Sequence, residues 1–338
     1  MTKPRLSAIL LTCALALSAG TPALAAPPRS FPVEAAPVLE DRYPVHVTTW
    51  PGGVTSLADV PYQTLSGYRP QIVDIYMPPR TAGPKPLILY IHGGGWIAGH
   101  TRHAGAMGNF PAALARLAGE GFVVASLEYR LAREAPFPAQ VQDARAALHF
   151  LKSHAARYGI DPARTGVWGG SAGGHIAALT ALTCGVSALN APDAAIAPGE
   201  ECVQAAAIWY GVFDVGALVA SRPGGTDQGI NTLLGCTGPC TPGQLSAASP
   251  DTYIDPRDPP FLLVHGEGDK TVPVAQSHLA ELALKQAGVP VQAIYIPGVD
   301  HSFIGGTPAQ TRDATLKAVN ATFDFFHQRL DHLPSRAK

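Results

Sequence analysis

Short apolar runs alternate with longer amphipathic segments along most of this chain. The runs are rich in Val, Ile, Leu and Phe and are bounded by Pro or Gly, which is typical of buried strands. In the longer segments, such as residues 141–158, apolar positions recur every three or four residues, as on one face of a helix. Strands alternating with helices predict an α/β fold: a mostly parallel, twisted sheet with helices on both faces.

The pattern places the individual elements as follows. Strands are expected at residues 72–76, 87–91, 122–127, 165–168, 205–210, 261–265 and 291–296. Helices are expected at residues 110–119, 141–158, 172–182, 277–286 and 311–330. In such sheets ligand sites gather at the carboxyl ends of the strands, so residues that follow each strand are the first candidates for chemistry.

The length of 338 residues favours one domain with insertions. Residues 26–65 contain many prolines and little periodicity, and we expect an N-terminal arm with short strands packed on the domain. Residues 66–332 should form the main α/β domain. Residues 211–253 are rich in Gly, Pro, Ser and Thr, which predicts an insertion near the site within that domain.

The N-terminus has the pattern of a secretory signal peptide. Lys3 and Arg5 precede an apolar stretch at residues 7–20, and a small-x-small pattern ends at Ala25. The alternative is a membrane anchor, but about 14 apolar residues are fewer than the ~20 that span a bilayer. We therefore expect residues 1–25 to be removed near Ala25, which leaves a mature chain without a membrane span, exported to the periplasm or the medium.

Export changes the interpretation of the cysteines. Four remain after cleavage, and an even number in an exported protein favours disulfides. The most local pairing joins Cys184 to Cys202 and Cys236 to Cys240. No histidine lies at zinc spacing near either pair, so we expect no metal and no other cofactor. The net charge of −1, without a basic stripe, argues against a nucleic-acid partner.

The sequence Gly169-Gly170-Ser171-Ala172-Gly173 matches the G-x-S-x-G nucleophile elbow. The motif lies between an expected strand and an expected helix, which is the context that it requires. A sharp turn there exposes the serine hydroxyl, and small neighbours let the chain pass closely. The sequence predicts Ser171 as a nucleophile.

A glycine-rich loop, from His92 to Trp96, follows the strand expected at 87–91. Stabilising an oxyanion requires N–H groups that are fixed before the reaction, and glycines can turn these groups inward without a Cβ in the way. Gly93 and Gly94 are the candidate donors of this loop, and Ala172 supplies a third. The alternative, a phosphate-binding loop, would need the Lys and Ser/Thr of a P-loop.

A serine hydroxyl requires a base, and the base requires an orienting acid. His301 and Asp269 each follow an expected strand, and the order serine, aspartate, histidine is that of α/β-hydrolases. Asp214 also follows a strand and stays open as an alternative acid. His175, one turn after the serine, is more simply explained by helix packing.

The segments His92–Trp96 and Gly169–Gly174, with those around Asp269 and His301, resemble the α/β-hydrolase fold-3 and feruloyl/acetyl-xylan esterase-like families and the related hormone-sensitive-lipase group. The resemblance extends over residues 74–326. It implies the α/β-hydrolase fold, a Ser171, Asp269 and His301 triad, and oxyanion donors at Gly93, Gly94 and Ala172.

The lipase-like group usually has Asp before the serine, whereas this chain has Gly170, which indicates the carbohydrate-esterase and formamidase-like side. We therefore expect a serine carboxylesterase that hydrolyses short-chain or aromatic acyl esters, carried by a small molecule or an oligosaccharide, including acetyl and feruloyl esters of polysaccharides. The alternatives are an amide hydrolase of formamidase or peptidase type and, in another class, an inactive binding module. The oligomeric state cannot be read from the sequence.

Overall fold

The computed structural model describes residues 45–79, 83–191, 196–197 and 199–331. The expected signal peptide and the first part of the expected arm lie outside these residues. Among the helices of the described ranges, none is long and apolar enough to cross a membrane.

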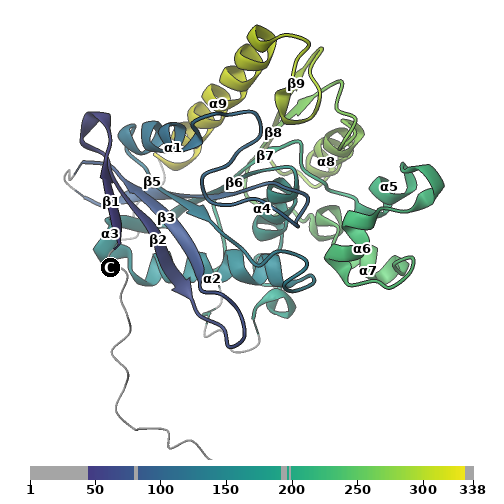
Figure 1. Ribbon diagram of the computed structural model, residues 1–338, viewed down its shortest axis with the longest axis horizontal. Coiled ribbons are helices and arrows are strands. Elements are labelled where there is room, and N and C mark those ends of the chain that lie inside the picture. The colour runs from purple at the N-terminus through teal and green to yellow at the C-terminus, as the bar shows by residue number, and fades with distance from the viewer. Residues whose placement is uncertain (1–44, 80–82, 192–195, 198, 332–338) are drawn as a thin grey trace, which may run out of the picture. The chain divides into compact units, whose positions relative to one another are not determined.

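Within the described ranges, the strands form one nine-stranded sheet in the order β1-β2-β3-β5-β4-β6-β7-β8-β9 (Figure 1). The first pairings, up to β3 with β5, are antiparallel, and those from β5 to β9 are parallel. This is the α/β-hydrolase fold that the sequence predicts. The strands are β1 (His46–Thr49), β2 (Thr55–Gln63), β3 (Gln71–Met77), β4 (Lys85–Ile91), β5 (Val123–Leu127), β6 (Ile160–Gly170), β7 (Ala205–Trp209), β8 (Phe261–Gly266) and β9 (Val291–Ile296).

Helices cover both faces of the sheet, as expected. The α-helices are α1 (Phe110–Gly119), α2 (Ala139–Ser153), α3 (Ala155–Tyr158), α4 (Ala172–Leu182), α5 (Val215–Ala220), α6 (Gln228–Leu234), α7 (Pro242–Ala247), α8 (Ala275–Gln286) and α9 (Pro308–Leu330). Short 3₁₀ helices include η4 (Pro250–Tyr253) and η5 (His301–Phe303). The helix expected at 141–158 is divided at His154 into α2 and α3.

Strand β4 contributes side chains to the hydrophobic cores on both faces of the sheet. Leu87, Leu89 and Ile91 contribute to a core that includes α2, α4 and α8, whereas Ile88 and Tyr90 contribute to a core that includes α1 and α9. All five side chains are buried, so the strand is apolar on both faces and shows no polar alternation. This continuous apolar character is what made the central strands recognisable in the sequence.

Residues 46–63, which the sequence analysis assigned to the arm, form β1 and β2, and β2 pairs with β3 in the same sheet. Short strands were expected in this segment without bounds, and irregular pairing explains why the pattern did not locate β2. The register of β2 shifts between Leu57 and Val60 and again between Pro61 and Gln63. Each shift interrupts the period of two on which recognition of a strand depends.

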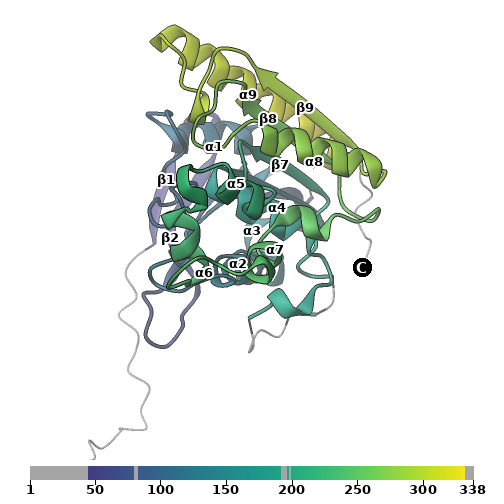
Figure 2. The same cartoon turned by 90° about the vertical axis from the view of Figure 1, so that its right-hand side faces the viewer.

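Residues 211–253 contain α5, α6, α7 and η4. Side-chain oxygens cap the three α-helices: Asp214 accepts from Ala217 N, Asp227 from Ile230 N, and Thr241 from Gln244 N. Figure 2 shows α5, α6 and α7 grouped in front of α4. Each helix has only six or seven residues, which is too short to show a helical period, so the capping residues are the main local indication of these helices.

Both expected disulfides are present. Cys184 is bonded to Cys202, with a Cα–Cα distance of 4.9 Å, and Cys236 is bonded to Cys240, with a Cα–Cα distance of 5.5 Å. The first closes the connection between α4 and β7. The second lies between α6 and α7.

Candidate active site

Ser171 lies in the turn between β6 and α4, with φ of 57° and ψ of −125°. A residue other than glycine is strained in this backbone region. The turn is tight because a Cβ at Gly169 would collide with the backbone of Gly173. Ser171 N donates to Trp209 O at 3.0 Å, which fixes the turn to β7. The side chain consequently stands at the carboxyl end of the central strands.

His301 and Asp269 meet Ser171 there in one chain of hydrogen bonds. His301 Nε2 lies 2.9 Å from Ser171 Oγ, and His301 Nδ1 lies 2.7 Å from Asp269 Oδ2. Since the carboxylate can only accept, Nδ1 carries the hydrogen and Nε2 is free to accept from the hydroxyl. The structure thus brings together three residues that are 32 and 130 positions apart along the chain.

The Asp269 carboxylate is held on both oxygens. Oδ1 accepts from Thr271 N and Val272 N, each at 2.8 Å, and Oδ2 faces His301. Burial by itself would raise the pKa of Asp269, but hydrogen bonds from His265 and His301 lower this pKa well below its ordinary value. The carboxylate is therefore charged near neutral pH, and it can orient the imidazole and stabilise an imidazolium.

His265 is a member of this network that the sequence analysis did not single out. Its fully buried ring lies at the end of β8, with Nε2 2.9 Å from Val272 O and 3.3 Å from Asp269 Oδ2. Nδ1 lies 2.7 Å from Ser277 Oγ on α8. The sequence did contain an indication, because His265 precedes Asp269 by four residues in the same strand-end segment.

Tyr210 is a second residue that the sequence did not suggest. It directly follows β7 and is buried, with its ring centroid 4.7 Å from that of His301 in an edge-to-face arrangement. Burial raises the pKa of the Tyr210 phenol, which stays neutral. Tyr210 packs on the imidazole from the side and limits its tilt.

The glycine loop lies directly against the serine. A Cβ at Gly93 would come within 2.8 Å of Gly170 O and 3.3 Å of Ser171 Cβ, so only glycine permits this approach. Among the described residues, the N–H groups of Gly93 and Gly94 have no acceptor. Ala172 N, in the first turn of α4, has no carbonyl within the helix to bind. These N–H groups are available to a ligand oxygen.

Asp214, the alternative acid, and two other carboxylates near His301 do not contact the imidazole. Asp214 caps α5, and Asp300 Oδ1 accepts from Lys270 N at 2.9 Å and from His301 N at 2.7 Å. Glu267, nearer the end of β8, is exposed. Asp269 is consequently the carboxylate that the fold places against His301 Nδ1. The described residues include no cluster of His, Cys, Asp and Glu that could hold a metal ion.

Residues 73–284 match the BD-FAE family. The chain belongs to this family. Residues 240–332 also match the prolyl oligopeptidase family, which adds the segment that carries Asp269 and His301.

Similar proteins include esterase LipQ of Mycobacterium tuberculosis, which is 32% identical over 253 residues, 73% of this chain and 57% of LipQ. The chain thus spans little more than half the length of this relative. Among solved structures, a truncated carbohydrate esterase from gut microbiota is 28% identical, with a TM-score of 0.66, covering 81% of this chain and 95% of that one. Thermogutta terrifontis esterase 2, phosphorylated by paraoxon, is 25% identical, with a TM-score of 0.64, covering 84% and 94%.

Proposed function

We propose that this protein is a serine carboxylesterase in which Ser171 is the nucleophile, His301 the base and Asp269 the orienting acid. The observation that carries the proposal is the unbroken chain of hydrogen bonds from Ser171 Oγ through the imidazole to Asp269, at 2.9 and 2.7 Å. Membership of the BD-FAE family and the esterases among its relatives support the same activity.

The first half of the reaction transfers the acyl group to the protein. Ser171 Oγ attacks the ester carbonyl carbon while its proton passes to His301 Nε2, and the carbonyl π electrons move to the oxygen. The tetrahedral intermediate then expels the alcohol, which takes the proton from Nε2. In the second half, water repeats these steps on the acyl-enzyme and releases the carboxylic acid.

Gly93, Gly94 and Ala172 are proposed to donate their N–H groups to the oxyanion of each intermediate. Their N–H groups are free, and the loop is in contact with the serine turn. Donors that are fixed in advance stabilise the developing charge without reorganising, which commonly provides the largest part of the rate acceleration.

A labelling experiment tests the nucleophile. Paraoxon should inactivate the protein at one equivalent and phosphorylate Ser171, as located by peptide mass spectrometry, while Ser171→Ala should take up no label. Ser153→Ala, which changes an exposed serine on α2, is the matched control and should label normally. A chelator should leave the esterase rate unchanged. A label on another residue, or inactivation by the chelator, would remove the serine mechanism.

The substrate is proposed to be an ester with a short or aromatic acyl group, on a small alcohol or an oligosaccharide, encountered after export. The N-terminal signal pattern, the two disulfides and the carbohydrate esterase among the similar structures support this proposal. A series from acetyl to long-chain p-nitrophenyl esters, with acetylated xylan and methyl ferulate, would define it. Highest kcat/KM for long-chain esters would contradict the short-acyl proposal.

Export has its own test. Sequencing the N-terminus of the protein recovered from the periplasm or the medium should show a start at Ala26. A mature protein that retains Met1 would contradict removal of the signal peptide.

Amide hydrolysis is the second candidate, because residues 240–332 match the prolyl oligopeptidase family. The same three residues could cleave an amide if the leaving amine is protonated by His301. Comparing p-nitrophenyl acetate, p-nitroacetanilide and an N-formyl aromatic amine distinguishes the two. We expect the ester to be preferred by more than the intrinsic difference in reactivity.

A further inference from the structure

His175 is a buried polar residue on α4 that the proposed mechanism does not use. It is 1% exposed, and it lies between the glycine loop and the segment that follows α7. Trp96 Nε1 lies 3.2 Å from His175 Nδ1, and Ala248 O lies 2.7 Å from His175 Nε2. Because an indole N–H can only donate and a carbonyl can only accept, Nδ1 is the acceptor and Nε2 carries the hydrogen.

Burial lowers the pKa of His175 to about 4, against a smaller opposing effect of the hydrogen bond to Ala248. The ring is therefore neutral in the pH range in which esterases work, and both of its contacts persist. If packing were the only requirement, an apolar side chain could occupy this position in the largely apolar α4. A histidine with both nitrogens engaged indicates a further role.

Trp96, the partner on the loop, has a strained backbone. Its φ is 61°, in the left-handed region that a bulky side chain rarely adopts. Such a conformation persists only when several contacts determine it. Two contacts do so here: Ala132 N donates to Trp96 O at 2.8 Å, and the indole donates to His175.

We propose that His175 is a positioning residue for the oxyanion hole, because it holds Trp96 and thereby fixes the direction of the Gly93 and Gly94 N–H groups. The turn after Gly94 is closed by its own backbone, since Gly94 O accepts from Ile97 N at 3.2 Å and from Ala98 N at 3.1 Å. The hydrogen bond from the indole to the imidazole ties this turn to α4. Through Ala248, the same ring ties the loop and α4 to the segment between α7 and η4. The inference rests on the proposed esterase function and adds a residue that acts through the loop.

Two substitutions with uncharged amides, His175→Asn and His175→Gln, distinguish the hydrogen bond to Trp96 from the hydrogen bond to Ala248. The asparagine side chain ends near the position of Nδ1 and the glutamine side chain near that of Nε2. His175→Asn can therefore accept from Trp96 but cannot reach Ala248 O, whereas His175→Gln can donate to Ala248 O but cannot accept from Trp96. The pair is matched in polarity and charge, so a general loss of packing should affect both.

On p-nitrophenyl acetate, His175→Gln should lower kcat about tenfold with little change in KM, which is less than the loss of an oxyanion donor outright. His175→Asn should stay within about twofold of the parent kcat, although its Tm falls. A short trifluoromethyl ketone, whose adduct with the serine carries an oxyanion, should bind His175→Gln more weakly by the same factor as kcat/KM falls. The affinity for the ketone reports on the oxyanion hole and not on folding.

Trp96→Phe provides an independent test should the glutamine variant fail to fold. It removes the indole N–H, keeps an aromatic ring and should lower kcat by a similar factor. In the double variant with His175→Gln, the losses should not add, because both changes break the same hydrogen bond.

Equal losses of kcat in the glutamine and asparagine variants, or unchanged ketone affinity in folded His175→Gln or Trp96→Phe, would overturn the positioning role. A parent protein without activity on any ester would overturn the proposed function and this inference together. A parent protein that is active, with variants that match it, would overturn only the inference.

Discussion

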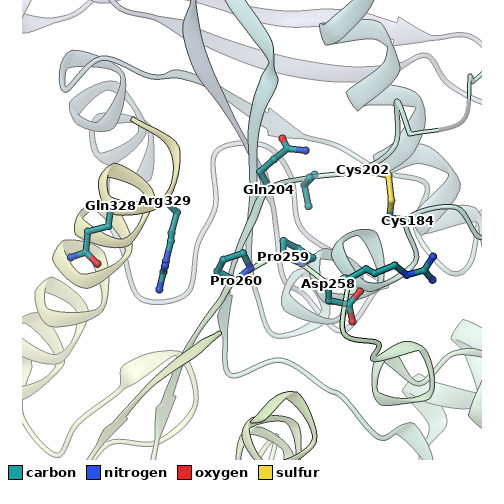
Figure 3. A pocket seen from close by; sticks show the side chains of 10 residues that line it. Cys184, Cys202, Gln204, Asp258, Pro259, Pro260, Gln328 and Arg329 are labelled. Carbon is teal, nitrogen blue, oxygen red and sulfur yellow. A yellow bond between two sulfur atoms is a disulfide. The ribbon is translucent and has the colours of Figure 1, made fainter. Parts of the chain in front are cut away.

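The two ends of strands β7 and β8 have very different surroundings. At their amino ends, next to Gln204 and Pro260, lies a pocket of about 610 Å³ that is bordered by the Cys184–Cys202 disulfide and by Arg329 (Figure 3). At their carboxyl ends lie Tyr210 and His265, within the network around Ser171.

The polar groups of the two regions differ in how they are held. In the amino-end pocket, Gln204 Oε1 and Asp258 Oδ2 each accept from one backbone N–H, and Arg257 pairs with Asp255, two residues away. Arg329 Nε has no hydrogen-bond partner among the described residues. At the carboxyl ends, Asp269 accepts from two backbone N–H groups and faces two imidazoles, those of His301 at 2.7 Å and His265 at 3.3 Å. His265 and His301 use both ring nitrogens. Catalysis depends on groups that are fixed before the substrate arrives, and a network of such groups lies at the carboxyl ends of the strands.

The largest expected effect distinguishes the two ends directly. Ser171→Ala should reduce esterase kcat by roughly 10⁶-fold, because the nucleophile is lost and only the oxyanion donors and binding remain. Gln204→Ala, in the other pocket, should leave kcat unchanged. Initial rates on p-nitrophenyl acetate, with circular dichroism to verify folding, measure both. Comparable losses of kcat in Ser171→Ala and Gln204→Ala would contradict an active site at the carboxyl ends of the strands.

Within the site, Asp269→Asn should lower kcat by about 10⁴-fold, because an amide can no longer hold the required tautomer or stabilise the imidazolium. Asp214→Asn is the matched control. Asparagine also caps helices well, so α5 should stay intact and the rate should be near that of the parent protein. If Asp214→Asn proved the more damaging of the two in folded protein, the acid would follow β7 instead.

Acid should weaken the carboxyl-end network through its buried histidines. Burial lowers the pKa of both His92 and His175 from 6.5 to about 4. Below pH 6.5 these two histidines therefore become protonated in the unfolded chain while they stay neutral in the folded protein. Full stability is present above that pH and is lost progressively down to about pH 4, by up to about 3 kcal/mol for each group.

Urea unfolding at pH 7.5, 5.5 and 4.5 measures this loss. His175→Gln carries no titrating group there and should lose less stability between pH 7.5 and 4.5 than the parent protein. His154→Gln, at an exposed position, should not reduce the loss. The same acid loss in all three proteins would show that other groups are responsible.

The smallest expected effect on kcat concerns the disulfide beside the amino-end pocket. Replacing Cys184 and Cys202 by serine should lower the free energy of unfolding by about 3 kcal/mol, since the disulfide closes a sequence separation of 18 residues. The Cys236–Cys240 bond spans 4, so its removal should cost less. Denaturant midpoints measure both losses. Neither change should alter kcat. A clear loss of kcat on removing the Cys184–Cys202 disulfide would show that the amino-end pocket influences the active site at the other end of the strands.

The sequence by itself determined the fold class and the core elements, because these depend on short-range patterns. The apolar strand runs, the periodic helices and the glycine motifs are all local, and most of these elements lie close to their expected bounds. The exceptions are β6, which begins at Ile160 and not at residue 165, and the helix expected at 141–158, which is divided. Elements with interrupted patterns did not emerge: β2, with its two register shifts, and the short capped helices α5, α6 and α7.

Only the tertiary structure decided which polar groups meet. The sequence offered Asp269 and Asp214 as acids, and the choice follows from Asp214 capping α5 while Asp269 faces His301 across 32 residues of chain. His175 likewise suggested packing, until Trp96 and Ala248, 79 and 73 residues away, were found on its two nitrogens. Hydrogen bonds require distances near 3 Å, and over such separations that precision comes from the packed sheet and helices, not from local pattern.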